Sequence, residues 1–110
     1  MDVSMETKND IMACRINGVI DINTSPELKK KFEKVVKEKV PKVLINLERV
    51  EYVDSSGLAT MVEILKKMRA YGGKLKLSNL SGKVKGLFEI TKLDKLFDIS
   101  DSESQALGSF

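Results

Sequence analysis

One short run of the sequence, Val43 to Leu47, constrains the fold more than any other segment. Its side chains are large and aliphatic except for Asn46. A strand with apolar residues on both of its faces is buried on both sides, whereas a half-exposed strand alternates polar and apolar residues. The run therefore favours a central strand in a parallel or mixed sheet that is covered by helices.

Two segments with helical periodicity flank this run. The first begins at Thr24-Ser25-Pro26-Glu27, where cap residues, a proline in the first turn and capping-box spacing predict a helix start, and Pro41 ends it. The second follows Asp54 and ends at Tyr71-Gly72-Gly73, a typical left-handed stop. The expected inward-facing residues are Leu28, Phe32, Val35, Val36 and Val40 in the first helix, and Leu58, Met61, Val62, Leu65 and Met68 in the second.

The remaining segments continue an alternation of strands and helices. The other predicted elements are strands at 10–17 and 19–22 that form a hairpin about Gly18, a connection at 48–53, a strand at 74–77, a helix from Ser81-Gly82, a short strand near Ile99 and a final helix beginning in 100–103. The order is β-β-α-β-α-β-α-β-α, which predicts an α/β fold with a mixed sheet and helices packed on it. We expect a single domain over residues 1–110.

The composition excludes several classes of protein. A chain of 110 residues with 42% hydrophobic and 32% charged side chains suits one folded domain. The absence of His excludes the usual serine triad and the commonest zinc geometry, and a single cysteine, Cys14, excludes an internal disulfide. We expect no metal and no cofactor. With no signal peptide and no apolar run of membrane-spanning length, we expect a cytoplasmic protein without a membrane partner.

The net charge does not indicate a nucleic-acid partner. The chain carries 19 basic and 16 acidic residues, a net charge of +3. Binding to nucleic acid usually requires a one-sided basic patch with stacking aromatic residues. Here the charges are mixed along the helices and the few aromatic residues have the spacing of core residues, so we expect no nucleic-acid binding.

The segment Asp54-Ser55-Ser56-Gly57 is the most informative for function. It lies where a strand ends and a helix begins. One interpretation is structural: one of the three polar residues caps the helix, and Gly57 permits close packing. The other is functional, because an exposed hydroxyl at the positive end of a helix is a favourable place for a phosphate group. The segment is neither a nucleophile elbow nor a phosphate-binding P-loop.

The segment Asp54-Ser55-Ser56-Gly57-Leu58, preceded by Val43-Leu44-Ile45-Asn46-Leu47, resembles the STAS domain. The chain is most similar to the bacterial anti-sigma factor antagonists of that family. Gly18-Val19-Ile20-Asp21, Gly72-Gly73-Lys74-Leu75 and the segment 87–99 agree in order and spacing. The resemblance covers about residues 8–107, and it implies a STAS fold.

The resemblance implies transcription regulation by partner switching. The unphosphorylated antagonist binds an anti-sigma factor, which is also a serine protein kinase, and thereby releases the sigma factor. Phosphorylation of the serine that follows the aspartate switches binding off, and a separate serine phosphatase restores it. That serine is Ser55 here, with Ser56 as the fallback. The family's partner-binding aspartate corresponds to Asp21, whereas Val19 stands where the family usually has an acidic residue.

The resemblance also implies a partner-binding surface around the switch serine. We expect it to comprise Asp21, Asn23, Thr24, Asp54, Ser55, Ser56, Gly57, Leu58 and Met61. For Leu58 and Met61 a place in the core is the competing interpretation. We expect a monomer that is not an enzyme. The alternative function is that of a STAS-domain scaffold or regulatory subunit in a stress-signalling or lipid-transport assembly.

Overall fold

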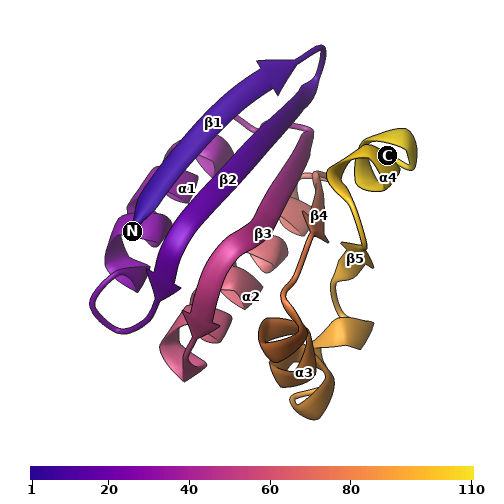
Figure 1. Cartoon of the computed structure of the whole chain (residues 1–110). Coiled ribbons are helices and arrows are strands. Elements are labelled where there is room, and N and C mark those ends of the chain that lie inside the picture. The colour runs from indigo at the N-terminus through magenta and orange to yellow at the C-terminus, as the bar shows by residue number, and fades with distance from the viewer.

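The computed structural model describes all 110 residues and contains one five-stranded sheet (Figure 1). The strands lie in the order β1-β2-β3-β4-β5; β1 is antiparallel to β2, and all other neighbours are parallel. Their bounds are Asp2–Lys8, Ile11–Ile20, Lys42–Val53, Lys74–Ser78 and Asp98–Ser100. The mixed sheet and the predicted order of elements are confirmed.

Helices α1 (Ser25–Lys37) and α2 (Ser55–Ala70) pack side by side against one face of the sheet (Figure 1). The other helical segments are α3 (Gly82–Ile90), a short 3₁₀ helix (Leu93–Lys95) and α4 (Glu103–Gly108), which contacts β3, β4 and β5. None of the helices has the length and apolar character needed to cross a membrane.

The core lies between the sheet and the α1–α2 layer. Val43, Ile45 and Leu47 of β3 are completely buried, as the apolar run predicted. They belong to one cluster with side chains from both helices, of which Phe32 and Met68 are among the largest. Complete burial of each such side chain stabilises the fold by about 1.5–3 kcal/mol, so this cluster fixes how α2 is placed on the sheet.

The N-terminal hairpin differs from the prediction. Residues 11–20 form one continuous strand, and its antiparallel partner is β1, which the sequence analysis did not identify. Gly18 does not end the strand. It has a φ of +120° and lies where the β2–β3 register shifts, but the extra residues at this shift are on β3, so β2 continues through Gly18 to Ile20. The turn of the hairpin lies instead at Asn9-Asp10, where Asn9 has a φ of 58°.

Strand β3 is also longer than predicted, because residues 48–53 continue it rather than form a connection. Val50 and Val53 are buried in this extension, whereas Arg49 and Tyr52 are exposed. The irregular spacing of apolar residues follows the shifted register with β2 and hides the strand pattern. The extension carries β3 as far as the end of β2, where Val53 pairs with Ile20, and places the start of α2 beside the loop between β2 and α1.

Candidate functional site at the start of helix α2

The start of α2 lies against the end of β2. The backbone N–H of Asp54 donates to the carbonyl oxygen of Ile20 at 3.1 Å, which fastens the turn to the neighbouring strand. Gly57 follows in the first turn of α2 and touches the same strand. A Cβ atom at Gly57 would lie 2.6 Å from the carbonyl oxygen of Ile20 and 2.9 Å from Cγ1 of Val53. The close packing expected of Gly57 is therefore present, and only glycine fits there.

Asp54 is the residue that caps α2. Its Oδ1 accepts hydrogen bonds from the backbone N–H of Gly57 at 2.9 Å and from the hydroxyl of Ser56 at 2.6 Å. Its Oδ2 accepts from the backbone N–H of Ile22 at 3.1 Å, across in the β2–α1 loop. The bond from Ser56, followed by that from Gly57, lowers the pKa of Asp54 below its ordinary value of 3.8. The carboxylate is therefore ionised at neutral pH.

The two serines of the segment differ in what holds their hydroxyl groups. Ser56 is half-buried and donates to Asp54. Ser55 is exposed, and its hydroxyl makes no hydrogen bond within the chain. It occupies the first position of a helix of 16 residues, where unpaired backbone N–H groups and the helix dipole favour a negative charge. Ser55 is thus the exposed and unbonded hydroxyl of the segment.

A second turn, Asp21 to Ser25, lies beside the first and precedes α1. Oδ1 of Asp21 accepts from the backbone N–H groups of Asn23 at 2.9 Å and Thr24 at 3.1 Å. The Thr24 hydroxyl donates to the carbonyl oxygen of Val19 at 2.7 Å and accepts from the N–H of Asp21 at 2.9 Å. Together with the bond from Ile22 to Asp54, these contacts bring the predicted residues Asp21, Asn23 and Thr24 next to the α2 start.

The capping box predicted at this second turn is not formed. The Thr24 backbone is helical, with φ −101° and ψ −22°, and its side chain makes no capping bond to α1. Its hydroxyl is used by Val19 and Asp21 instead, because the turn folds back toward the end of β2. The sequence spacing could not reveal this competition between a local cap and a contact with the strand.

Leu58 and Met61 do not contribute to the surface. Leu58 is 6% exposed, Met61 is completely buried, and both belong to the core cluster. Their assignment to the partner-binding surface is therefore corrected: both side chains point from α2 toward the sheet layer because they lie on the apolar stripe of the helix. The competing interpretation, a place in the core, describes both residues.

Exposed apolar side chains near the turn were missed by the sequence analysis. Ile22 is 71% exposed, Tyr52 45% and Ile90 83%. Ile22 donates its N–H to Asp54, and Tyr52 lies two residues before it. Tyr52 and Ile90 border a groove of about 270 Å³ between β3 and α3, where Lys83 lies over the Tyr52 ring at 5.5 Å. An apolar surface next to a polar turn suits contact with another protein.

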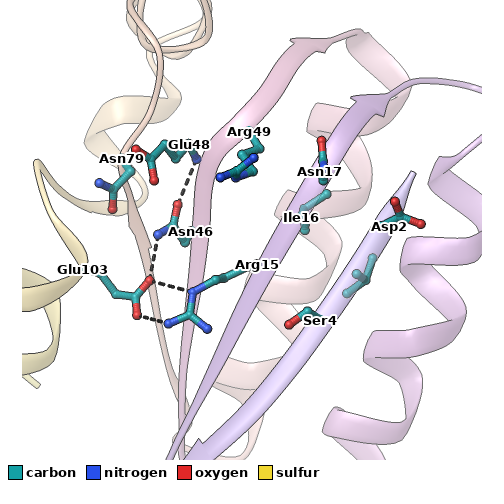
Figure 2. A pocket seen from close by; sticks show the side chains of 11 residues that line it. Asp2, Ser4, Arg15, Ile16, Asn17, Asn46, Glu48, Arg49, Asn79 and Glu103 are labelled. Atoms are coloured by element: carbon teal, nitrogen blue, oxygen red, sulfur yellow. Dashed lines mark hydrogen bonds and ion pairs between the residues drawn. The ribbon is translucent and has the colours of Figure 1, made fainter.

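A polar pocket of about 600 Å³ lies on the other side of the sheet and contains none of the predicted site residues (Figure 2). There the guanidinium of Arg15 donates to both carboxylate oxygens of Glu103, and the Asn46 amide donates to the same carboxylate at 2.7 Å. The pKa of Glu103 is lowered overall. Burial by itself would raise this pKa, but the hydrogen bonds from Asn46 and Arg15 to the ionised carboxylate outweigh the effect of burial. This network ties α4 to the sheet.

The protein offers little to a metal ion or to thiol chemistry. No three His, Cys, Asp or Glu side chains gather where they could hold a metal ion. Cys14 is completely buried in β2, and burial raises the pKa of its thiol to about 12. A thiol of that pKa is not a nucleophile at neutral pH. The chemistry of the site is therefore that of one accessible hydroxyl beside a carboxylate.

Comparison with known proteins identifies relatives of the whole chain. The family model described as STAS domain matches residues 2–106. The Bacillus subtilis protein named anti-sigma-B factor antagonist is 38% identical over 103 residues, which cover 91% of this chain and 93% of the relative. A Thermotoga maritima protein, named as a candidate anti-sigma factor antagonist, is 27% identical, with a TM-score of 0.91 over 96% of this chain and 92% of that one.

A more distant likeness concerns the fold alone. The Bacillus cell fate determinant SpoIIAA, solved in its phosphorylated form, superposes with a TM-score of 0.75 at 19% identity, over 97% of each chain.

Proposed function

Because the chain belongs to the STAS domain family, we propose that it is an anti-sigma factor antagonist that phosphorylation of Ser55 switches off. The observation that carries the proposal is the free, exposed hydroxyl of Ser55 at the first position of α2. The unphosphorylated form of the protein binds a cytoplasmic anti-sigma factor with serine kinase activity and so releases a sigma factor. A serine phosphatase returns the modified protein to the binding form. The protein itself is regulatory and not an enzyme.

Ser55 is a better acceptor of phosphate than Ser56. A kinase has to place the hydroxyl oxygen in line with the terminal phosphate of ATP, which requires an accessible group with freedom to rotate. Ser56 is half-buried and is held by its 2.6 Å bond to Asp54. Modifying it would break that bond and place a phosphate against an ionised carboxylate. The Ser55 hydroxyl is exposed and makes no such bond, so we assign the modification to it.

The added charge acts at the contact surface and leaves the fold in place. A phosphate brings about −1.5 to −2 charges, and at a helix start the dipole partly offsets them. In a complex, the same group would lie in a desolvated contact beside Asp54. Burying a charge without a partner costs several kcal/mol, and about 1.4 kcal/mol corresponds to a tenfold loss of affinity. One modification is therefore enough to dissociate a complex of micromolar affinity.

The contact surface extends from Ser55 over the neighbouring turn. Asp21, Asn23, Thr24, Asp54, Ser56 and Gly57 shape the backbone there, whereas Ile22 and Tyr52 supply exposed apolar area. Apolar side chains beside an exposed serine allow tight binding when the hydroxyl is free. The same arrangement desolvates a phosphate when the serine is modified.

The test uses each kinase-type anti-sigma factor that the source genome encodes, with ATP. Mass spectrometry of the wild type should locate phosphate on Ser55, and Ser55→Ala should remain unmodified while it still binds. Ser55→Asp should bind at least tenfold more weakly yet give the far-UV circular dichroism of the wild type. Ser56→Ala is the matched control and should still be phosphorylated. Phosphate on Ser56, or no binding to any such factor, contradicts the proposal.

A further inference from the structure

Strand β1 has one side paired and the other side free. It forms the outer edge of the sheet beside β2 (Figure 1). The hairpin of β1 and β2 has a two-residue turn at Asn9-Asp10, and Lys8 and Ile11 are the paired residues on either side of that turn. In such a hairpin the closing pair exchanges hydrogen bonds, and the pattern then alternates. The even-numbered residues of β1 therefore bond to β2, and Val3, Met5 and Thr7 direct their N–H and C=O groups away from the sheet.

We propose that β1 pairs antiparallel with β1 of a second copy of this chain, about a two-fold axis at Met5. The two five-stranded sheets then join into one. Val3 lies opposite Thr7 of the second copy on each side of the central Met5 pair. Each of these facing pairs exchanges two backbone hydrogen bonds, because all of these residues direct their backbone groups outward. The pairing also covers Met5, whose side chain is 38% exposed.

The charges of β1 select this register over its neighbours. In the register centred on Met5, Asp2 lies opposite Lys8 of the second copy, and this attraction occurs twice. Centring on Ser4 would instead place Asp2 opposite Glu6, and centring on Glu6 would place two glutamates opposite each other. Registers centred between residues would set an outward residue against an inward one and lose the hydrogen bonds. Opposite charges across strands stabilise a pair, and like charges destabilise it.

The neighbouring helix limits the strength of this association. A groove of about 590 Å³ runs between β1 and α1, where Val3 and Met5 face Lys30, Lys31 and Lys34. A two-fold axis perpendicular to the sheet keeps both α1 helices on the same side, so their lysines approach each other. We therefore expect an equilibrium that populates the pair only in concentrated solution. The monomer expected from the sequence is then its dilute form.

Charge reversal tests the register directly. Asp2 and Lys8 are both exposed, and neither reversal disturbs a buried contact. By sedimentation equilibrium, Asp2→Lys and Lys8→Asp should each dimerise about tenfold more weakly than the wild type, because two attractive pairs become repulsive. An equimolar mixture of the two variants should recover dimerisation, because every facing pair in the mixed dimer again joins opposite charges. A mixture no stronger than the single variants contradicts the register.

A backbone substitution tests the strand itself. Met5→Pro removes an N–H that points away from β2, so β1 should remain paired within the chain. This variant should stay monomeric and give the circular dichroism of the wild type. In the wild type, hydrogen exchange at Val3, Met5 and Thr7 should slow as concentration rises. The proposal is wrong if the wild type is monomeric in concentrated solution or if Met5→Pro still dimerises. It is also wrong if exchange at these amides slows only when an acidic peptide, which could bind the lysines of the groove, is added.

Discussion

The two helix starts beside the end of β2 contain similar residues and use them differently. At the start of α1, the Thr24 hydroxyl is bonded to Val19 and Asp21, and Ser25 is buried with its hydroxyl 2.6 Å from the Asp21 carbonyl oxygen. At the start of α2, Asp54 alone satisfies the cap and takes the Ser56 hydroxyl as well. Only at the start of α2 does a hydroxyl, that of Ser55, remain free.

This difference shows what makes a serine available for modification. Position at a helix start is not sufficient, because Ser25 has that position too and is buried. What matters is that a neighbouring carboxylate performs the structural work of the turn. Asp54 does so for α2, so we expect the turn to keep its shape when Ser55 carries another group.

Gly57→Ala should have the largest effect, because it breaks the packing of the α2 start against β2. The new methyl group would meet the Ile20 backbone, which cannot move without shifting β2. We expect a loss of about 2–4 kcal/mol in the free energy of unfolding, measured by urea denaturation. Gly86→Ala is the matched control: it lies in α3 with open space around its Cβ position, and should be neutral or stabilising. Equal losses in both variants would contradict the close contact at Gly57.

Thr24→Val should reduce the free energy of unfolding by an intermediate amount. Comparison with a variant of Asp54 shows whether the two turns depend differently on pH. The substitution removes the hydrogen-bond partner of the Val19 carbonyl oxygen and of the Asp21 N–H. We expect this loss to lower the free energy of unfolding by about 1–2 kcal/mol. Because no ionisable group is removed, the loss should be similar at pH 7 and pH 3.

Asp54→Asn should instead give a loss that depends on pH. The folded-state pKa of Asp54 is lowered, so its ionisation stabilises the fold fully above its ordinary pKa of 3.8 and less as pH falls through the folded value. The stability difference from the wild type should therefore be largest near pH 7 and shrink under acid. Urea denaturation across this range measures both variants, and a constant difference for Asp54→Asn would contradict the ionised cap.

Ser55→Ala should have the smallest effect. Its hydroxyl has no partner, so the free energy of unfolding should stay within about 0.5 kcal/mol of the wild type. Ser56→Ala should cost more, because it removes the bond that holds the Asp54 carboxylate. Thermal unfolding of both variants at the same pH measures the difference. The reverse order would mean that Ser55, not Ser56, supports the turn.

The sequence was most informative where local signals and burial agree. The run Val43 to Leu47 predicted a buried central strand, and Asp54 and Ser81 do cap α2 and α3. The resemblance to the STAS domain is confirmed by the family match. In these regions apolar periodicity and cap residues point to the same structure, so a single sequence is enough.

Prediction was weaker where contacts between distant segments decide the structure. Strand β1 was missed although Val3, Met5 and Thr7 alternate with polar residues, because an edge strand carries few apolar side chains and the alternation is weak. Ile90 and Tyr52 approach each other only once α3 has packed beside β3. The periodicity of β3 or of α3 alone does not indicate that these two elements pack together. The exposed apolar surface near Ser55 could therefore not be predicted from the sequence.

The bond from Ile22 to Asp54 has a consequence for how such proteins diverge. Ile22 and Asn23 hold the turn through their backbone N–H groups, while their side chains point into solvent. Substitutions at these two positions therefore change the exposed surface without removing a bond that shapes it. Under the proposed function, related chains could therefore differ in the partner that this surface contacts and still keep the turn that carries Ser55.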